Sequence, residues 1–289
     1  MDQGVIKAVK DIIYASRDAL PALVDCPSLD VTVSCSNWSV PPPSTRAPSQ
    51  LEQLILRPAG RNEAAIQSAV SLLLQHIGHR LRVLTIDPKY WSISLGRDAA
   101  NAISQSCPAL EVLEVRLVDD EFIEQLVAAL STRPDACRVQ RLTLSSYSPT
   151  KTFAALLATL RMATHSLTRS LRSLRFNCGY FGCEGEDLEQ FITAVREMLS
   201  VNERLRDVTI HGLVSETQGR AGFSVVLAPL RHRLALLSAL QHRGLPQCVL
   251  ATVVAMTGHR VQRLRLESYD GADANSEIEC EPNDNGYSS

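Results

Sequence analysis

The stretch LEVLEV at residues 110–115 displays the pattern that decides the fold of this chain. Apolar residues occupy its first, fourth and sixth positions, and the same spacing recurs along the sequence. The other copies are LEQLIL at 51–56, LRVLTI at 81–86, VQRLTL at 139–144, LRSLRF at 171–176, LRDVTI at 205–210 and VQRLRL at 261–266. The first six copies begin 30, 29, 29, 32 and 34 residues apart, and the last begins 56 residues after the sixth. This spacing indicates an internal repeat of about 30 residues with one degenerate or inserted unit.

Each copy is predicted to form a short strand, because its fourth and sixth positions turn apolar side chains to one face. Between copies the apolar spacing becomes that of a helix, at residues 66–77, 122–130, 153–160 and 188–199. Asp119 and Asp187 are placed to cap two of these helices. A strand-loop-helix unit can bury its apolar faces only against neighbouring units. The sequence therefore predicts an α/β protein of stacked units with parallel strands.

This pattern resembles the leucine-rich repeat family over roughly residues 29–266. The repeat length and the helix in each unit are similar to the long, ribonuclease-inhibitor-like class, and CPALEVL at 107–113 resembles the cysteine-containing type. The family usually has Asn or Cys at the ninth position of each unit. Here that position holds other residues, namely Ala59, Lys89, Val118, Tyr147, Gly179, Leu213 and Tyr269. The resemblance implies a leucine-rich-repeat-like solenoid, built from degenerate repeats, whose parallel strands line one exposed surface.

Three regions follow from these patterns. Residues 1–50 are expected to form an N-terminal cap or degenerate first unit with a proline-rich loop, because Pro41, Pro42 and Pro43 interrupt regular structure. Residues 51–267 are expected to form the solenoid, with an irregular helical pair at 230–258. Residues 268–289 contain six acidic residues and no basic one, which predicts a disordered acidic tail.

Charge and hydropathy bear on the partner and the compartment. The chain has 289 residues, a formal net charge of −2 and a sequence pI of about 6.4, so its charge does not favour a nucleic acid or a membrane as partner. Lys7 and Lys10 interrupt any signal-peptide core, and the longest apolar runs are too short to span a bilayer. We therefore expect an intracellular, cytoplasmic protein whose eight cysteines are mostly reduced.

Motifs for catalysis or metal binding are weak in this sequence. It contains no phosphate loop, no nucleophile elbow and no paired-glycine nucleotide motif. His76 and His79 have no Cys or acidic partner at metal-ligand spacing, and Cys178 and Cys183 have no second pair. We therefore predict a protein that is not an enzyme, with no catalytic residues, no metal site and no cofactor.

The resemblance implies that outward side chains on the strands, and just beyond them, bind a partner. The partner-binding residues predicted in this way are Arg57, Asp87, Glu114, Arg116, Arg141, Arg175, Asn177, Asp207 and His211. This surface is acidic toward the middle and more basic from Arg141 to Arg175, which suits a protein better than a phosphate backbone. Our first hypothesis is a non-enzymatic protein–protein interaction module or scaffold.

A second hypothesis is a substrate-recognition adaptor of a ubiquitin ligase. Leu245 and Pro246, followed by apolar residues at helical spacing up to Gly258, are faintly similar to the start of an F-box, the segment that docks onto the ligase core. F-boxes usually precede the repeats, and no Trp-containing helix follows here. A plain helical pair is therefore the favoured interpretation of residues 245–258.

Overall fold

The structure is a computed structural model of the chain, and it describes residues 28–34, 51–59, 63–88, 95–116, 119–131, 137–146, 149–178, 185–215, 219–227, 261–268 and 276–279. The strands are β1 (Ser28–Ser34), β2 (Gln53–Ala59), β3 (Val83–Ile86), β4 (Val112–Val115), β5 (Arg141–Ser146), β6 (Ser173–Cys178), β7 (Asp207–Ser215), β8 (Gly219–Leu227), β9 (Val261–Ser268) and β10 (Ser276–Glu279). The helices are α2 (Glu63–Ile77), the 3-10 helix η2 (Gly78–Arg80), α3 (Gly96–Ser106), α4 (Asp120–Ser131), α5 (Pro149–Leu160), α6 (Ser166–Ser170) and α7 (Gly185–Val201).

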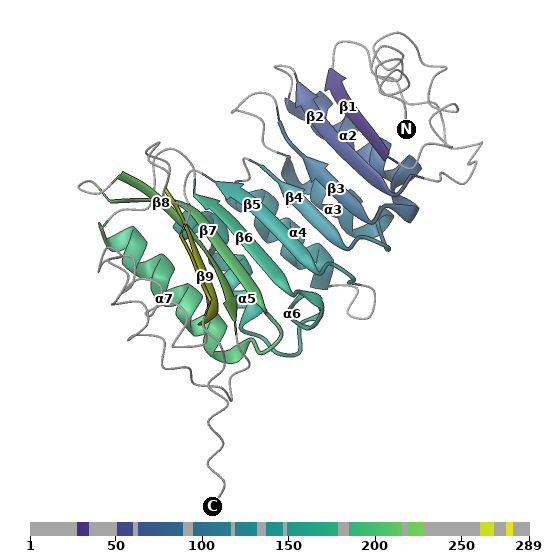
Figure 1. The fold of residues 1–289 in the computed structure, drawn as a ribbon. Helices are drawn as coiled ribbons and strands as arrows, with labels where there is room; N and C mark the ends of the chain where they lie inside the picture. The colour runs from purple at the N-terminus through teal and green to yellow at the C-terminus, as the bar shows by residue number, and fades with distance from the viewer. Residues whose placement is uncertain are drawn as a thin grey trace, which may run out of the picture.

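All ten strands belong to one sheet and are ordered as they occur in the chain (Figure 1). Strands β1 to β7 pair in parallel, each with the next. The register aligns the repeat copies. The fourth positions pair along the sheet as Leu54, Leu84, Leu113, Leu142, Leu174 and Val208, and the sixth as Leu56, Ile86, Val115, Leu144, Phe176 and Ile210. The α/β class and the alternation of strands with helices are thus as the sequence predicts.

The core lies between one face of the sheet and a layer of helices. Helices α2, α3, α4, α5 and α7 follow one another along that face, and each packs on the next (Figure 1). The aligned fourth and sixth positions are buried, as are the apolar residues that the helical spacing singles out in α2, α4 and α5. Phe153, Phe176 and Phe191 pack together, with ring centroids 4.5 Å apart for the first two and 5.6 Å for the last two. Burial of each leucine side chain contributes about 2 kcal/mol to the stability of the fold. The apolar residues recur at the repeat spacing because those positions face this buried layer.

The C-terminal part of the sheet departs from the parallel prediction. The last repeat copy does form a strand, β9, but it runs antiparallel to β8, and β8 runs antiparallel to β7. Only three residues separate β7 from β8, which is too short a connection for a parallel crossover and long enough for a hairpin. The copy at 261–266 therefore runs in the same direction as β1 to β7, but β8 lies between it and β7, so it has no parallel neighbour.

The predicted disordered tail contains a strand. Ser276–Glu279 form β10, which pairs antiparallel with β9, so the prediction of disorder is wrong over these four residues. The register sets Glu277 opposite Arg265 and Glu279 opposite Arg263. Residues of opposite charge in directly opposed positions favour such a pairing, and this accounts for a strand in a segment of low hydropathy.

Helix starts were predicted with mixed success. The Asp119 carboxylate accepts a 2.7 Å hydrogen bond from the backbone N–H of Phe122, which confirms the predicted N-cap of α4. Helix α7 begins at Gly185, so Asp187 lies inside its first turn and not at the cap position. Of the predicted N-terminal cap at 1–50 only residues 28–34 are described, and its proline-rich loop and the helical pair at 230–258 lie outside the described residues.

Candidate interaction surface

The outward positions of the strands form the face of the sheet opposite to the helices. No helix among the described elements covers this face (Figure 1). Of the nine predicted site residues, Arg57, Arg116, Arg141, Arg175 and Asp207 are exposed, and Asp87, Glu114, Asn177 and His211 are partly buried. The register brings neighbours together, because Glu114 pairs with Thr143, Thr143 with Arg175, and Asn177 with His211. The predicted residues therefore share one surface that crosses β2 to β7.

The half of this face that spans β1 to β4 carries a chain of ion pairs. Arg57 donates two hydrogen bonds to the Asp30 carboxylate, of 3.0 and 3.1 Å, and it lies 4.0 Å from Asp87. Arg116 in turn lies 3.3 Å from Asp87 and 3.2 Å from Glu114. The hydrogen bond that the Arg57 guanidinium donates to Asp30 raises the pKa of Arg57. Charges alternate along this chain, so each is largely neutralised by its neighbours.

Four of the predicted site residues thus contact one another through salt bridges, and the fifth member of the network, Asp30, was not predicted. Asp30 pairs with Ile55 in the register, and Arg57 lies two residues further along β2, so its side chain reaches back along the same face of the sheet. Exposed ion pairs contribute about 0–1 kcal/mol each. A network that joins four neighbouring strands holds side chains in place more than it stabilises the fold.

The half that spans β5 to β7 differs in charge. Arg141 and Arg175 are exposed, and neither forms a salt bridge with any side chain in the described ranges. Asn177 donates a 3.1 Å hydrogen bond to Ser145 on the neighbouring strand. Within the described ranges, the face therefore has one half whose charges are paired and one half in which Arg141 and Arg175 are not.

A second row of charges lies at the entry edge, the edge of the sheet where β3 to β7 begin. It holds the second residue of each of the first six repeat copies: Glu52, Arg82, Glu111, Gln140, Arg172 and Arg206. After the first member, each backbone N–H in this row donates a 2.8 Å hydrogen bond to the carbonyl of the preceding member. At the β3–β4 end, Arg82 forms a salt bridge of 2.9 Å with Glu111. At the β6–β7 end the corresponding neighbours are both cations, Arg172 and Arg206.

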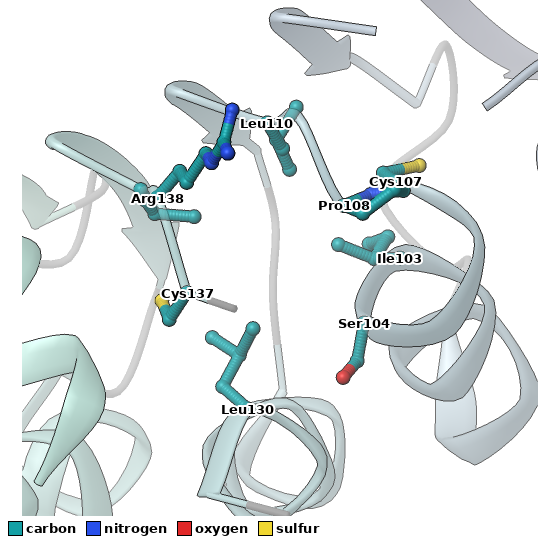
Figure 2. Close-up of a pocket in the computed structure, with 9 residues that line it drawn as sticks. Ile103, Ser104, Cys107, Pro108, Leu110, Leu130, Cys137 and Arg138 are labelled. Carbon is teal, nitrogen blue, oxygen red and sulfur yellow. The ribbon is translucent and has the colours of Figure 1, made fainter. Parts of the chain in front are cut away.

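A small cavity lies between α3, α4 and the starts of β4 and β5 (Figure 2). Its volume is about 20 Å³, enough for a single water molecule and too small for a substrate or cofactor. Cys107 and Cys137 lie on opposite sides of it, and both are free thiols. Burial raises the pKa of Cys107 to about 12, so this thiol is not a nucleophile at neutral pH.

Ser131 and His165 form a hydrogen bond between Oγ and Nε2, a contact that resembles a nucleophile with its base. The surrounding bonds assign it another role. His165 Nδ1 accepts from the backbone N–H of Leu167, so the neutral ring carries its proton on Nε2. The Ser131 hydroxyl meanwhile donates to the carbonyl of Val127. The imidazole is thus the donor to Ser131 and cannot take its proton in this arrangement.

The described ranges hold neither a metal cluster nor a membrane span. No group of three or more His, Cys, Asp or Glu side chains gathers there in a way that would hold a metal ion. The same ranges contain no helix with the length and apolar character needed to cross a bilayer. The side chains of His76, Cys178 and Cys183 and the F-box-like stretch at 245–258 lie outside what the structure describes.

Comparison with known proteins adds no assignment. Neither protein-family models nor curated proteins give a match to this chain.

Proposed function

We propose that the protein is a non-enzymatic interaction module that binds a protein partner through the exposed, strand-lined face of its sheet. The architecture proposed with it is a leucine-rich-repeat-like solenoid. Three features support that architecture: the sequential strand order, the aligned repeat positions and the helices on one face of the sheet.

The observation that carries the proposal is the cationic half of the face. Arg141 and Arg175 are exposed on strands where the core does not require a charge, and no carboxylate in the described ranges neutralises them. Guanidinium groups pair bidentately with carboxylates and are enriched at protein interfaces. The ion-paired half, from Asp30 to Glu114, would flank such a contact as an ordered polar rim.

Affinity purification with quantitative mass spectrometry tests this proposal. The variant Arg141→Glu/Arg175→Glu should fold normally, because exposed substitutions change stability by less than about 0.5 kcal/mol. It should lose the specific partners that the wild type retains, since charge reversal adds repulsion to the lost contacts.

The matched control is Lys151→Glu/Arg196→Glu, which makes the same change of charge at exposed positions of α5 and α7. It should retain every partner, and circular dichroism establishes that both variants are folded. If the control loses the partners while Arg141→Glu/Arg175→Glu retains them, the helix layer is the binding surface and the proposal fails.

A further inference from the structure

The entry edge of β6 and β7 carries positive charge that no carboxylate in the described part of the chain compensates. Arg172 donates from Nη1 to the carbonyls of Arg169 and Leu171, at 3.1 and 3.3 Å, so backbone oxygens hold its guanidinium in place. Its side chain forms no salt bridge with a carboxylate in the described ranges. Burial lowers the pKa of Arg172, and the nearby charges of Arg204 and Arg206 lower it further. Arg172, Arg204 and Arg206 are called the arginine cluster below.

The opposite end of the same edge shows what a compensated pair looks like. Arg82 and Glu111 occupy the second positions of neighbouring repeat copies, and Arg82 Nη2 lies 2.9 and 3.1 Å from the two carboxylate oxygens. Arg172 and Arg206 occupy the equivalent positions in the copies that form β6 and β7, joined by the same 2.8 Å backbone bond. The arginine cluster therefore has the backbone geometry of an ion pair without the carboxylate.

The acidic residues close to the cluster in sequence do not supply that carboxylate. Glu203 and Asp207 are exposed, and neither forms a salt bridge with the arginine cluster in the described structure. A partly buried guanidinium beside two like charges is destabilising unless an anion binds. An external carboxylate would relieve this repulsion and would accept bidentate hydrogen bonds.

We propose that the arginine cluster of Arg172, Arg204 and Arg206 binds an acidic segment of a protein partner, with Asp or Glu carboxylates neutralising its guanidinium groups as Glu111 neutralises Arg82. This inference rests on the proposed function, because it takes the ligand to be a protein, and it adds a second contact beside the strand-lined face. A nucleic acid fits less well. The cluster spans two strands about 5 Å apart, and its neighbours along the edge are the uncharged Gln140 and the paired Glu111. A duplex needs a longer cationic track.

The test measures binding of a fluorescein-labelled hexaglutamate peptide by fluorescence anisotropy, at about 50 mM salt to limit screening. Arg206→Glu should weaken the peptide at least about tenfold, because it replaces an attractive charge with a repulsive one. Its melting temperature should be equal to that of the wild type or higher, because the new carboxylate would pair with Arg172 as Glu111 pairs with Arg82. A residue with only a structural role would not combine these two effects. Arg196→Glu on α7, with the same change of charge, should leave the affinity within about twofold.

Other outcomes are decisive too. If Arg206→Glu does not yield folded protein, Arg204→Gln/Arg206→Gln is measured and should lose affinity in the same direction. The inference is overturned if the wild type does not bind hexaglutamate, if Arg206→Glu and Arg196→Glu weaken peptide binding equally, or if a DNA duplex of equal charge binds more tightly.

The sheet-face variant distinguishes this inference from the proposed function. If Arg141→Glu/Arg175→Glu alone abolishes peptide binding, the acidic segment binds on the sheet face. The inference then fails and the proposed function stands. If Arg206→Glu loses the peptide while Arg141→Glu/Arg175→Glu retains every partner, the proposed function fails instead.

Discussion

Leu113 shows how the repeat pattern acts at the scale of one residue. It is the fourth residue of the copy at 110–115, its side chain is fully buried, and it pairs with Leu84 on one side and Leu142 on the other. Leu113→Asp places a carboxylate without a partner in this layer, and it should lower the free energy of unfolding by about 3 kcal/mol or more. Urea denaturation followed by circular dichroism measures the change. An unaltered midpoint would mean that this position does not face the core.

Inward residues were predictable from the sequence, and charged partners were not. Spacing alone decides which side chains of a strand face the core, and the predicted positions Leu84, Leu142 and Leu174 are buried. Ion pairs depend on which strands are neighbours and on side-chain conformation. The network therefore includes Asp30, which no repeat position singles out, and it leaves Arg141 out. The residues that share the face were thus predictable, whereas the pairs that neutralise one another were not.

The short helix α6 depends on His165 at its N-cap, a role that no spacing rule indicates. His165 Nδ1 accepts the backbone N–H of Leu167, which requires an unprotonated ring nitrogen. Burial lowers the pKa of His165, and the positive charge of Arg169 lowers it further. Because the folded-state pKa lies below that of the unfolded chain, His165 stabilises the fold above about pH 6.5. That contribution is lost as the pH falls through the folded-state pKa.

His165→Asn should separate the cap from its titration. The Asn side chain also accepts from a backbone N–H at an N-cap, and it does not titrate. The variant should lose less stability than the wild type between about pH 7.5 and pH 5, a range that spans histidine titration. Thermal melts at a series of pH values measure the difference, and NMR titration of the His165 ring reports its pKa directly. Equal losses in the two proteins would show that His165 does not contribute to the acid sensitivity.

Elements with strong apolar periodicity were predicted, and those with weak periodicity were not. The apolar faces predicted α2, α4 and α5, whereas α3 buries small residues such as Ala99, Ala100 and Ala102, which add little to the apolar periodicity of the sequence.

Gly78 is needed for a close contact that the sequence pattern does not reveal. A Cβ on Gly78 would lie 2.8 Å from the Cys107 sulfur and from the Ser106 carbonyl oxygen, so η2 approaches the end of α3 only because residue 78 has no side chain.

At the scale of the whole molecule, charge is divided along the sheet. From β1 to β4 the face and the entry edge are ion-paired, through Arg57 on the face and Arg82 on the edge. From β5 to β7 the cations lack such partners in the described ranges, on the face at Arg175 and on the edge at Arg172. The net charge of −2 conceals this division. Composition therefore could not predict this division of charge, because the division arises only when the strands are aligned in the sheet.

Both proposed contacts depend on strands that are aligned in one register, because that register sets the outward residues side by side and brings Arg206 next to Arg172 at the entry edge. A cross-linking measurement tests this most directly. Ser145 and Asn177 are register partners on β5 and β6, and their side chains are hydrogen-bonded at 3.1 Å. Ser145→Cys/Asn177→Cys should react with a short bifunctional thiol reagent in the native protein, and mass spectrometry would identify the linked peptides. Ser145→Cys/Arg175→Cys, displaced by two residues along β6, should cross-link far less, because direct strand neighbours are only about 5 Å apart. Preferential linkage through position 175, or no linkage at either pair in folded protein, would contradict the register and with it both proposed contacts.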